Sequence, residues 1–186
     1  MNSARPLTAV LVACLAGALH AATLERLSLD DMVAKSTDIV RGRVVSSSAG
    51  FRGTPQRGGI IYTYYTVEVA ERWKGGGGSR IDIAVPGGTV GNLRQTFAGA
   101  PSLFPATDYV LFLWTSPSGL TEIIGLTQGL MNLKIDASGK ATLVRGVVSE
   151  PMVDAYGRPV TDGGFSMSLQ DFRSTMSRYG LTGVQQ

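Results

Sequence analysis

The sequence predicts a mainly β domain, a closed or partly closed antiparallel barrel with a short N-terminal helix and a C-terminal helix. Three observations lead to this prediction. Apolar and polar residues alternate over several short segments, as in strands with one buried face. Residues 108–115 are apolar on both faces, which is typical of a central strand covered from both sides. Helix-capping patterns precede residues 29 and 169, near the two ends of the chain.

The first 22 residues have the pattern of a secretory signal peptide. Arg5 is the only charged side chain before Glu25, and an apolar stretch over 7–19 follows it. This stretch is too short to span a bilayer, which needs roughly 20 apolar residues. We therefore expect the chain to be exported.

Two cleavage sites fit the leader, after Ala21 and after Ala22, because each leaves alanine at its end. The mature protein is then expected to be one domain over 23–186, secreted or periplasmic. An alternative interpretation makes Cys14 the lipidated N-terminus of an anchored lipoprotein. The apolar residues that follow Cys14 count against it, since a polar tether is expected there.

The composition excludes several classes of enzyme from the mature chain. Cys14 and His20 are the only cysteine and the only histidine, and both precede the expected cleavage. No Ser-His or Cys-His catalytic pair and no zinc site of histidine and thiolate can then form, and we expect no metal and no cofactor. The net charge of +3 comes from scattered basic residues, so the sequence does not indicate nucleic-acid binding. No apolar segment after the leader is long enough to span a membrane.

The first predicted elements are a helix and two strands. Ser-Leu-Asp-Asp at 28–31 is typical of a helix start, and the helix is expected to end near Ser36. The apolar periodicity then changes to two, which predicts a strand over 39–45. A polar loop is expected over 46–59, followed by the longest strand over 60–74.

Shorter strands follow in the second half. A flexible turn of four glycines leads into a strand over 80–85 that ends at Pro86. A turn at 136–139 is expected to join two strands as a hairpin. From about residue 150 a turn-rich C-terminal extension leads to a final helix, which Ser168 caps. The other strands are predicted over 108–115, 122–125, 130–135 and 141–145.

Three motifs in this order resemble the netrin-like domain, the barrel that tissue inhibitors of metalloproteinases also use. The segment 36–44 looks like its first strand, 64–69 running into Trp73-Lys74-Gly75 is similar to its second strand and turn, and 108–113 looks like its later buried strand. The chain also resembles small secreted bacterial proteins that share the Pro86-Gly87-Gly88 run.

The resemblance implies a barrel of the oligonucleotide/oligosaccharide-binding (OB) type. In the metalloproteinase inhibitors an N-terminal cysteine binds the catalytic zinc of the protease. The mature chain here has no cysteine, so the resemblance carries over the fold and not that inhibitory chemistry.

A first candidate binding site is the long segment 86–107 between two predicted strands. Segments of this length in compact domains are often functional. Here Arg94 and Gln95 would supply polar contacts and Phe97 an apolar anchor. The alternative is an extra strand near 93–97 packed onto the barrel.

A second candidate is an aromatic and basic face. Tyr62 and Tyr64 share the outward face of the long strand, and Arg41 and Arg43 lie nearby if the first two strands pair. The alternative is that these are cross-strand pairs that stabilise the sheet.

The sequence favours a secreted, non-enzymatic binding module that recognises a protein or a surface glycan. An inhibitor-like role is a narrower version that only the family resemblance suggests. The alternatives are an envelope enzyme that works without cysteine and histidine, and a structural or assembly factor of the envelope.

Overall fold

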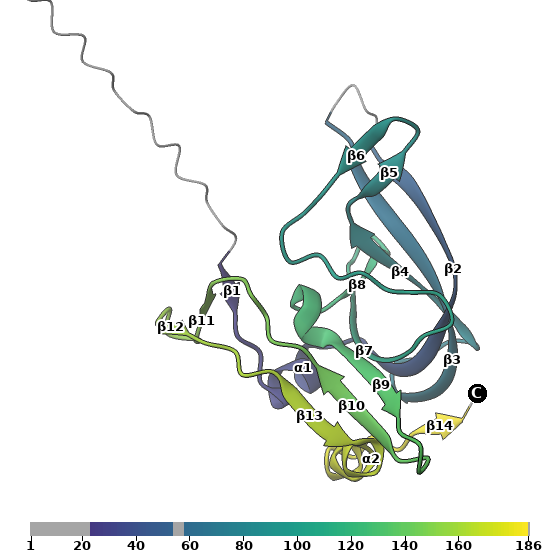
Figure 1. Cartoon of the computed structure of the whole chain (residues 1–186), viewed down its shortest axis with the longest axis vertical. Coiled ribbons are helices and arrows are strands. Elements are labelled where there is room, and N and C mark those ends of the chain that lie inside the picture. Colours follow the sequence, from purple (N-terminus) through teal and green to yellow (C-terminus); the bar gives the residue numbers. More distant parts are fainter. Residues whose placement is uncertain (1–22, 54–57, 186) are drawn as a thin grey trace, which may run out of the picture.

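The computed structural model describes residues 23–53 and 58–185, and it confirms the mainly β class (Figure 1). The predicted signal peptide, both of its cleavage sites and the alternative lipid anchor lie outside the described residues. In these two ranges no helix is long and apolar enough to cross a membrane.

The two predicted helices are present as α1 (Leu29–Lys35) and α2 (Leu169–Arg178), and a 3₁₀ turn, η2, covers Leu126–Gly129. Both helices begin at a serine cap, because the hydroxyls of Ser28 and Ser168 accept hydrogen bonds from backbone N–H groups three residues on. The strands are β1 (Leu24–Glu25), β2 (Asp38–Arg52), β3 (Ile60–Lys74), β4 (Arg80–Pro86), β5 (Gly88–Val90), β6 (Leu93–Gln95), β7 (Asp108–Thr115), β8 (Thr121–Ile123), β9 (Leu130–Ile135), β10 (Ala141–Arg145), β11 (Met152–Val153), β12 (Pro159–Val160), β13 (Phe165–Ser168) and β14 (Val184–Gln185).

One large antiparallel sheet dominates the fold, in the order β13-β10-β9-β7-β2-β3. Strands β4 and β14 both pair with the outer edge of β3, and β8 pairs with β7 beyond the end of β9. Among the described residues these ladders do not close the sheet into a barrel. Strands β4 and β8 have Cα atoms within 8 Å of each other, but no backbone ladder joins them.

Strand β2 is twice as long as the sequence predicts. The prediction of a loop over 46–59 is wrong for residues 46–52, because they continue β2 and pair with the start of β3. Most side chains in this part of β2 are exposed, so it has no alternation of apolar and polar residues. Backbone pairing to a neighbouring strand, which no local pattern reveals, makes it a strand.

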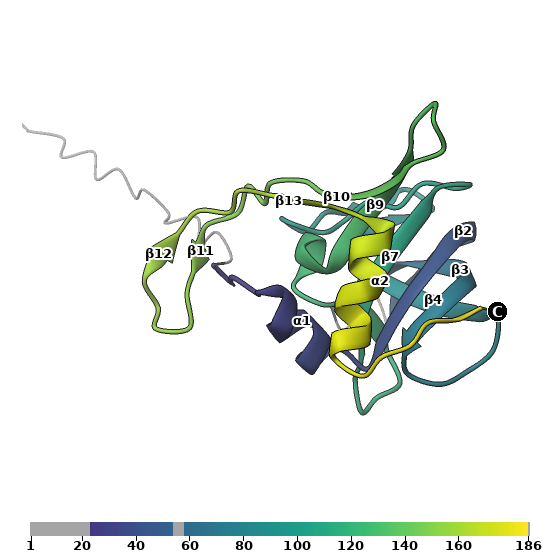
Figure 2. The same cartoon turned by 90° about the horizontal axis from the view of Figure 1, so that it is seen from below.

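Two apolar cores lie on opposite faces of the large sheet. The sheet curls around the first, which includes Val44, Val67, Ile83, Leu113 and Ile123. The second lies between the sheet and the two helices, which cover the same side (Figure 2). It includes Met32 of α1, Phe172 and Met176 of α2, and Ile39, Trp73, Val110 and Phe112 of the sheet. Strand β7 contributes to both cores, which confirms its predicted central place.

A bulge in β3 decides which residues face the helices. The register shifts between the pairs Arg41–Glu71 and Gly42–Val69, so Ala70 has no residue opposite it. One extra residue exchanges the two faces of the strand that follows. Val69 therefore lies in the first core, whereas Trp73 packs edge-on against Phe172 of α2, at 5.0 Å between ring centroids.

The same bulge turns the buried Glu71 toward α2. Its carboxylate accepts hydrogen bonds from Arg173 at 2.7 and 2.9 Å, and Nε of Arg41 lies 3.4 Å from it. The carboxylate is thus buried with two cations beside it, the condition under which a protein interior tolerates a charge.

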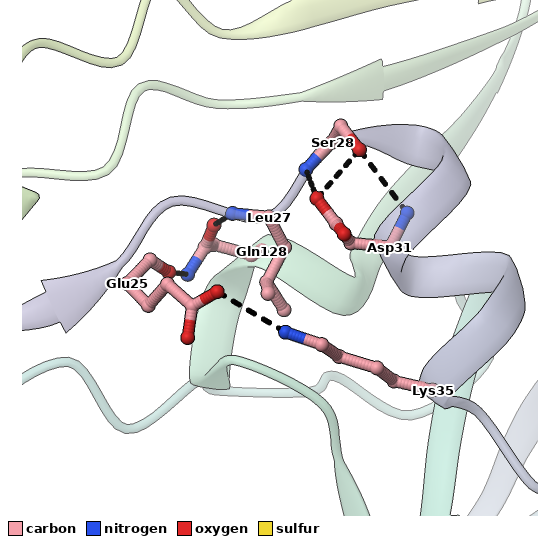
Figure 3. A network of polar contacts seen from close by, with 6 residues as sticks. All are labelled: Glu25, Leu27, Ser28, Asp31, Lys35 and Gln128. Carbon is pink, nitrogen blue, oxygen red and sulfur yellow. Dashed lines mark hydrogen bonds and ion pairs between the residues drawn. The ribbon is translucent and has the colours of Figure 1, made fainter. Parts of the chain in front are cut away.

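The N-terminal strand belongs to a separate small sheet. Strand β1 runs parallel to β11, which forms a hairpin with β12. This hairpin extends away from the large sheet (Figures 1 and 2). Gln128 of η2 joins the segment between β1 and α1 to the body of the domain, through hydrogen bonds to the backbone of Glu25 and Leu27 (Figure 3).

Candidate functional site

An apolar cleft of about 560 Å³ lies at the seam between β4 and β8. Ala84 and Pro86 form its β4 side, and Trp114 of β7 and Glu122 of β8 form the opposite side. Ile124 and Leu126 extend the wall toward η2. Clefts of this size with mostly apolar walls and few charged groups are typical of binding sites.

Strand register explains why these side chains face the cleft. Leu113 and Ile123 are opposite one another and point into the first core, so Trp114 and Glu122, the next opposite pair, point outward. In β4, Ile83 and Val85 fill the same core. The open seam thus places an exposed tryptophan beside a carboxylate and next to an apolar strand edge.

Glu122 is the distinctive polar group of the cleft. Burial raises the pKa of this carboxyl, and the charge of Arg52 offsets the increase only in part. No lysine or arginine of the described part of the chain lies within the 4 Å of an ion pair with it. Glu122 is therefore a partly buried negative charge that a ligand cation can pair with.

Trp114 supplies the aromatic surface beside that charge. Its side chain is 42% exposed although it lies in the central strand of the sheet. A cation placed over an indole face and against a carboxylate is attracted by both groups. The pair Trp114–Glu122 thus favours a ligand that carries a positive charge next to an apolar group.

Lys35 also lines the cleft and already has a partner. Its Nζ is 3.2 Å from Oε1 of Glu25, an exposed ion pair shown in Figure 3. The charge of Lys35 is therefore balanced within the chain. Glu122 is the charged residue of the lining without an ion pair among the described residues.

The cleft offers an apolar surface with one carboxylate and one ammonium group. Glu122 is the one carboxylate of the lining, so a pair of carboxylates for acid–base catalysis is not formed there. In the described ranges no three His, Cys, Asp or Glu side chains come together in a way that could hold a metal ion.

The segment 86–107 contains the extra strand that the alternative interpretation predicted. Strands β5 and β6 form a hairpin over Gly88–Gln95 that packs against β2 and β3. Arg94, Gln95 and Phe97 come together beside a hollow of about 250 Å³. The amide of Gln95 is engaged by the backbone, since it accepts from Ile61 N at 2.7 Å and donates to the Gly59 carbonyl at 3.2 Å.

The predicted aromatic and basic face is divided between two parts of the β2–β3 hairpin. Tyr62 and Tyr64 stay together, with ring centroids 6.2 Å apart, opposite Gly50 and Ser48. Arg43 lies farther along, opposite Glu68, and is paired with Asp108 at 2.5 Å. The two arginines and Glu68 line another hollow, of about 500 Å³.

Tyr62 connects the predicted tyrosine pair to the cleft. Burial raises the pKa of its hydroxyl, and the negative charge of Glu122 adds to the increase. The tyrosine pair therefore lies within electrostatic reach of the cleft. Sequence reasoning missed Trp114 and Glu122 because an apolar strand and a short neighbour give no sign of which side chain stays exposed.

Comparison with known proteins identifies no relative: no family model, no curated protein and no solved structure matches this chain.

Proposed function

We propose that this chain is an exported, non-enzymatic binding module that recognises a protein partner. The cleft between β4 and β8 takes a projecting apolar side chain of that partner, and Glu122 pairs with a positive charge beside it. The observation that carries the proposal is the partly buried Glu122, which has no ion partner in the described ranges and stands opposite the exposed Trp114.

Magnitudes favour a protein partner over a free small molecule. Burial of one large apolar side chain contributes about 2 kcal/mol, and a cation over an aromatic ring adds about 1 kcal/mol. Together they amount to about 3 kcal/mol, which is less than the roughly 4 kcal/mol of a Kd of about 1 mM. Useful affinity then needs further contacts around the cleft, which a protein surface supplies.

The apolar walls also favour a protein side chain over a surface glycan. A sugar presents several hydroxyl groups, each of which needs a hydrogen-bond partner once it is buried. The charged groups of the lining are Glu122 and Lys35, and its other residues are almost all apolar. An apolar side chain with a neighbouring cation matches this distribution better.

The proposal includes the frame that carries the cleft, a partly closed barrel of the OB type that is open between β4 and β8. The support is that these strands approach within 8 Å and share the first core without a backbone ladder. Export is the remaining part of the proposal, and it rests on the leader pattern over 1–22.

The test is titration of the mature protein with two capped peptides, observed by NMR. One peptide has Phe next to Arg in a Gly/Ser background, and the other has Glu in place of Arg. We expect the Phe-Arg peptide to shift the indole signal of Trp114 and the amides of β8, and the Phe-Glu peptide to bind more weakly.

Two variants complete that test. Glu122→Gln should reduce the preference for the Arg peptide, whereas Glu68→Gln, on an exposed part of β3, should preserve it. Equal binding of both peptides, or shifts confined to residues outside the cleft, would overturn the proposal.

A further inference from the structure

The β11–β12 hairpin presents an aromatic side chain at its turn. Tyr156 lies between the two strands and is 84% exposed, more than any other large hydrophobic residue described. The hairpin extends away from the body of the domain (Figure 2). Burial of this ring in the surface of a partner would contribute favourable free energy to binding.

The turn that carries Tyr156 is rigidly built. The carboxylate of Asp154 accepts hydrogen bonds from the backbone N–H of Tyr156 at 2.9 Å and of Arg158 at 3.0 Å. Gly157 adopts a φ of 77°, which favours glycine, and its N–H donates to the Asp154 carbonyl. These bonds fix the backbone of the turn, so ordering the turn adds little to the entropic cost of binding.

A cation accompanies the aromatic ring. The guanidinium of Arg158 lies 5.2 Å from the centre of the Tyr156 ring, and its side chain is 72% exposed. Nε and one amino group hold it against Asp154, with Nε at 2.7 Å from the carboxylate. The turn thus displays an apolar ring next to a guanidinium that Asp154 pairs through Nε and one amino group, so a partner carboxylate would meet the donors of the other amino group. This is the combination proposed for the ligand of the cleft between β4 and β8.

We propose that the ligand of the cleft is a second copy of this chain, through Tyr156 and Arg158 of its β11–β12 hairpin. This inference rests on the proposed function of the cleft. Tyr156 enters the apolar space beside Trp114, and Arg158 pairs with Glu122. Insertion into the cleft of the same copy is excluded, because Tyr156 is exposed there.

The hairpin and the cleft are different surfaces, so the contact is heterologous. Each copy that donates its hairpin keeps an open cleft, and each copy that receives one keeps a free hairpin. Contacts of this kind continue into rings or filaments. The expected behaviour is an average mass that rises with concentration and does not stop at the dimer.

The experiment is light scattering of the mature protein over a concentration series that reaches the millimolar range. We expect Tyr156→Ser, which lacks the ring, and Glu122→Lys, which opposes the cation, to remain monomeric. Ile135→Ser removes another exposed apolar side chain, at the end of β9, and should assemble like the unaltered chain. Circular dichroism of each variant checks that it is folded.

Mixing the two monomeric variants gives the decisive result. The Tyr156→Ser copy still has a working cleft, and the Glu122→Lys copy still has a working hairpin. The mixture should form dimers and nothing larger, because the other hairpin and the other cleft are both blocked. Assembly of either variant alone, or no dimer in the mixture, would overturn the proposal.

The peptide titration and the concentration series together distinguish self-association from binding at the cleft. A protein that binds the Phe-Arg peptide at Trp114 but stays monomeric at every concentration has a binding cleft with a different protein partner. A protein that binds no peptide and shows no assembly has neither property.

Discussion

The side-chain amide of Gln128 makes the hydrogen bonds to the backbone next to Leu27 that a neighbouring strand would otherwise make. Its Oε1 accepts a hydrogen bond from Leu27 N at 2.8 Å, and its Nε2 donates to the Glu25 carbonyl at 3.0 Å (Figure 3). Gln128 is 1% exposed, so the amide has no water to replace these partners. It therefore fixes the path from β1 into α1.

Loss of that amide should weaken the N-terminal segment. We expect Gln128→Ala to lower the free energy of unfolding by about 2–3 kcal/mol, because it leaves two backbone groups without partners and opens a small cavity. Urea denaturation measures the loss, and hydrogen exchange should show faster opening at Leu27. Gln128→Glu keeps an acceptor for Leu27 but buries a carboxylate against the Glu25 carbonyl, so it should cost at least as much at neutral pH and less in acid, where the protonated carboxyl can donate. A cost of this variant that does not change with pH would contradict this account.

Gly42 lies at a point of β2 where β3 leaves no room for a side chain. A Cβ at this position would lie 2.5 Å from the Glu68 carbonyl oxygen and 2.6 Å from a methyl group of Val67. We expect Gly42→Ala to destabilise the domain by about 2 kcal/mol or more, as overpacking against backbone does. Gly50, in the same strand, has as its nearest neighbour a Tyr64 carbon at 3.8 Å, so Gly50→Ala should be close to neutral. Thermal unfolding of the two variants measures the contrast.

The elements that local pattern determines could be predicted from the sequence. The serine caps at Ser28 and Ser168 begin the two helices, and the two-sided apolar run 108–115 is the central strand. The turn at 136–139 joins β9 and β10 as expected. Each of these depends on residues a few positions apart, so a single sequence contains the signal.

Features that depend on distant pairing could not be predicted in this way. The extension of β2 over Ser46–Arg52 exists because β3 pairs with it, and the bulge at Ala70 reverses the alternation that the sequence displays. Trp114 points away from the first core because of its register with β8, and the cleft beside it exists because β4 and β8, thirty or more residues apart, do not join. The cleft was therefore missed, although the strands around it were predicted.

The ion pair of Arg145 and Asp162 should make the free energy of unfolding depend on pH. Their side chains are 10% and 4% exposed, and the guanidinium donates to both carboxylate oxygens, at 2.6 and 3.0 Å. Burial alone would raise the pKa of Asp162, but hydrogen bonds from Arg145 and from the backbone outweigh it and hold the pKa below 3.8.

A lowered pKa in the folded state means that the unfolded chain takes up the proton first. The contribution of Asp162 is therefore complete above about pH 3.8, its unfolded value, and is lost as the pH falls through the folded value. We expect Asp162→Asn to cost about 3 kcal/mol at neutral pH, because Arg145 loses its buried partner. Urea denaturation at several pH values should show a smaller loss on acidification for this variant. An unchanged acid dependence would show that other carboxylates cause it.

We expect peptide binding at the cleft to depend on pH with a midpoint set by Glu122, not by Asp162. A ligand cation is attracted by the ionised form of Glu122, and burial raises the pKa of this carboxyl above its ordinary 4.5. Affinity for the Phe-Arg peptide should therefore decline as the pH falls through that raised value, at a higher pH than an ordinary glutamate would give.

The effect of Glu122 on folding has the opposite sign. The buried charge destabilises the native state above its raised pKa, so Glu122→Gln should increase the free energy of unfolding at neutral pH while it weakens binding. Peptide titrations and urea curves at matched pH values measure both effects, and a variant that lost stability and affinity together would show that Glu122 supports the fold instead.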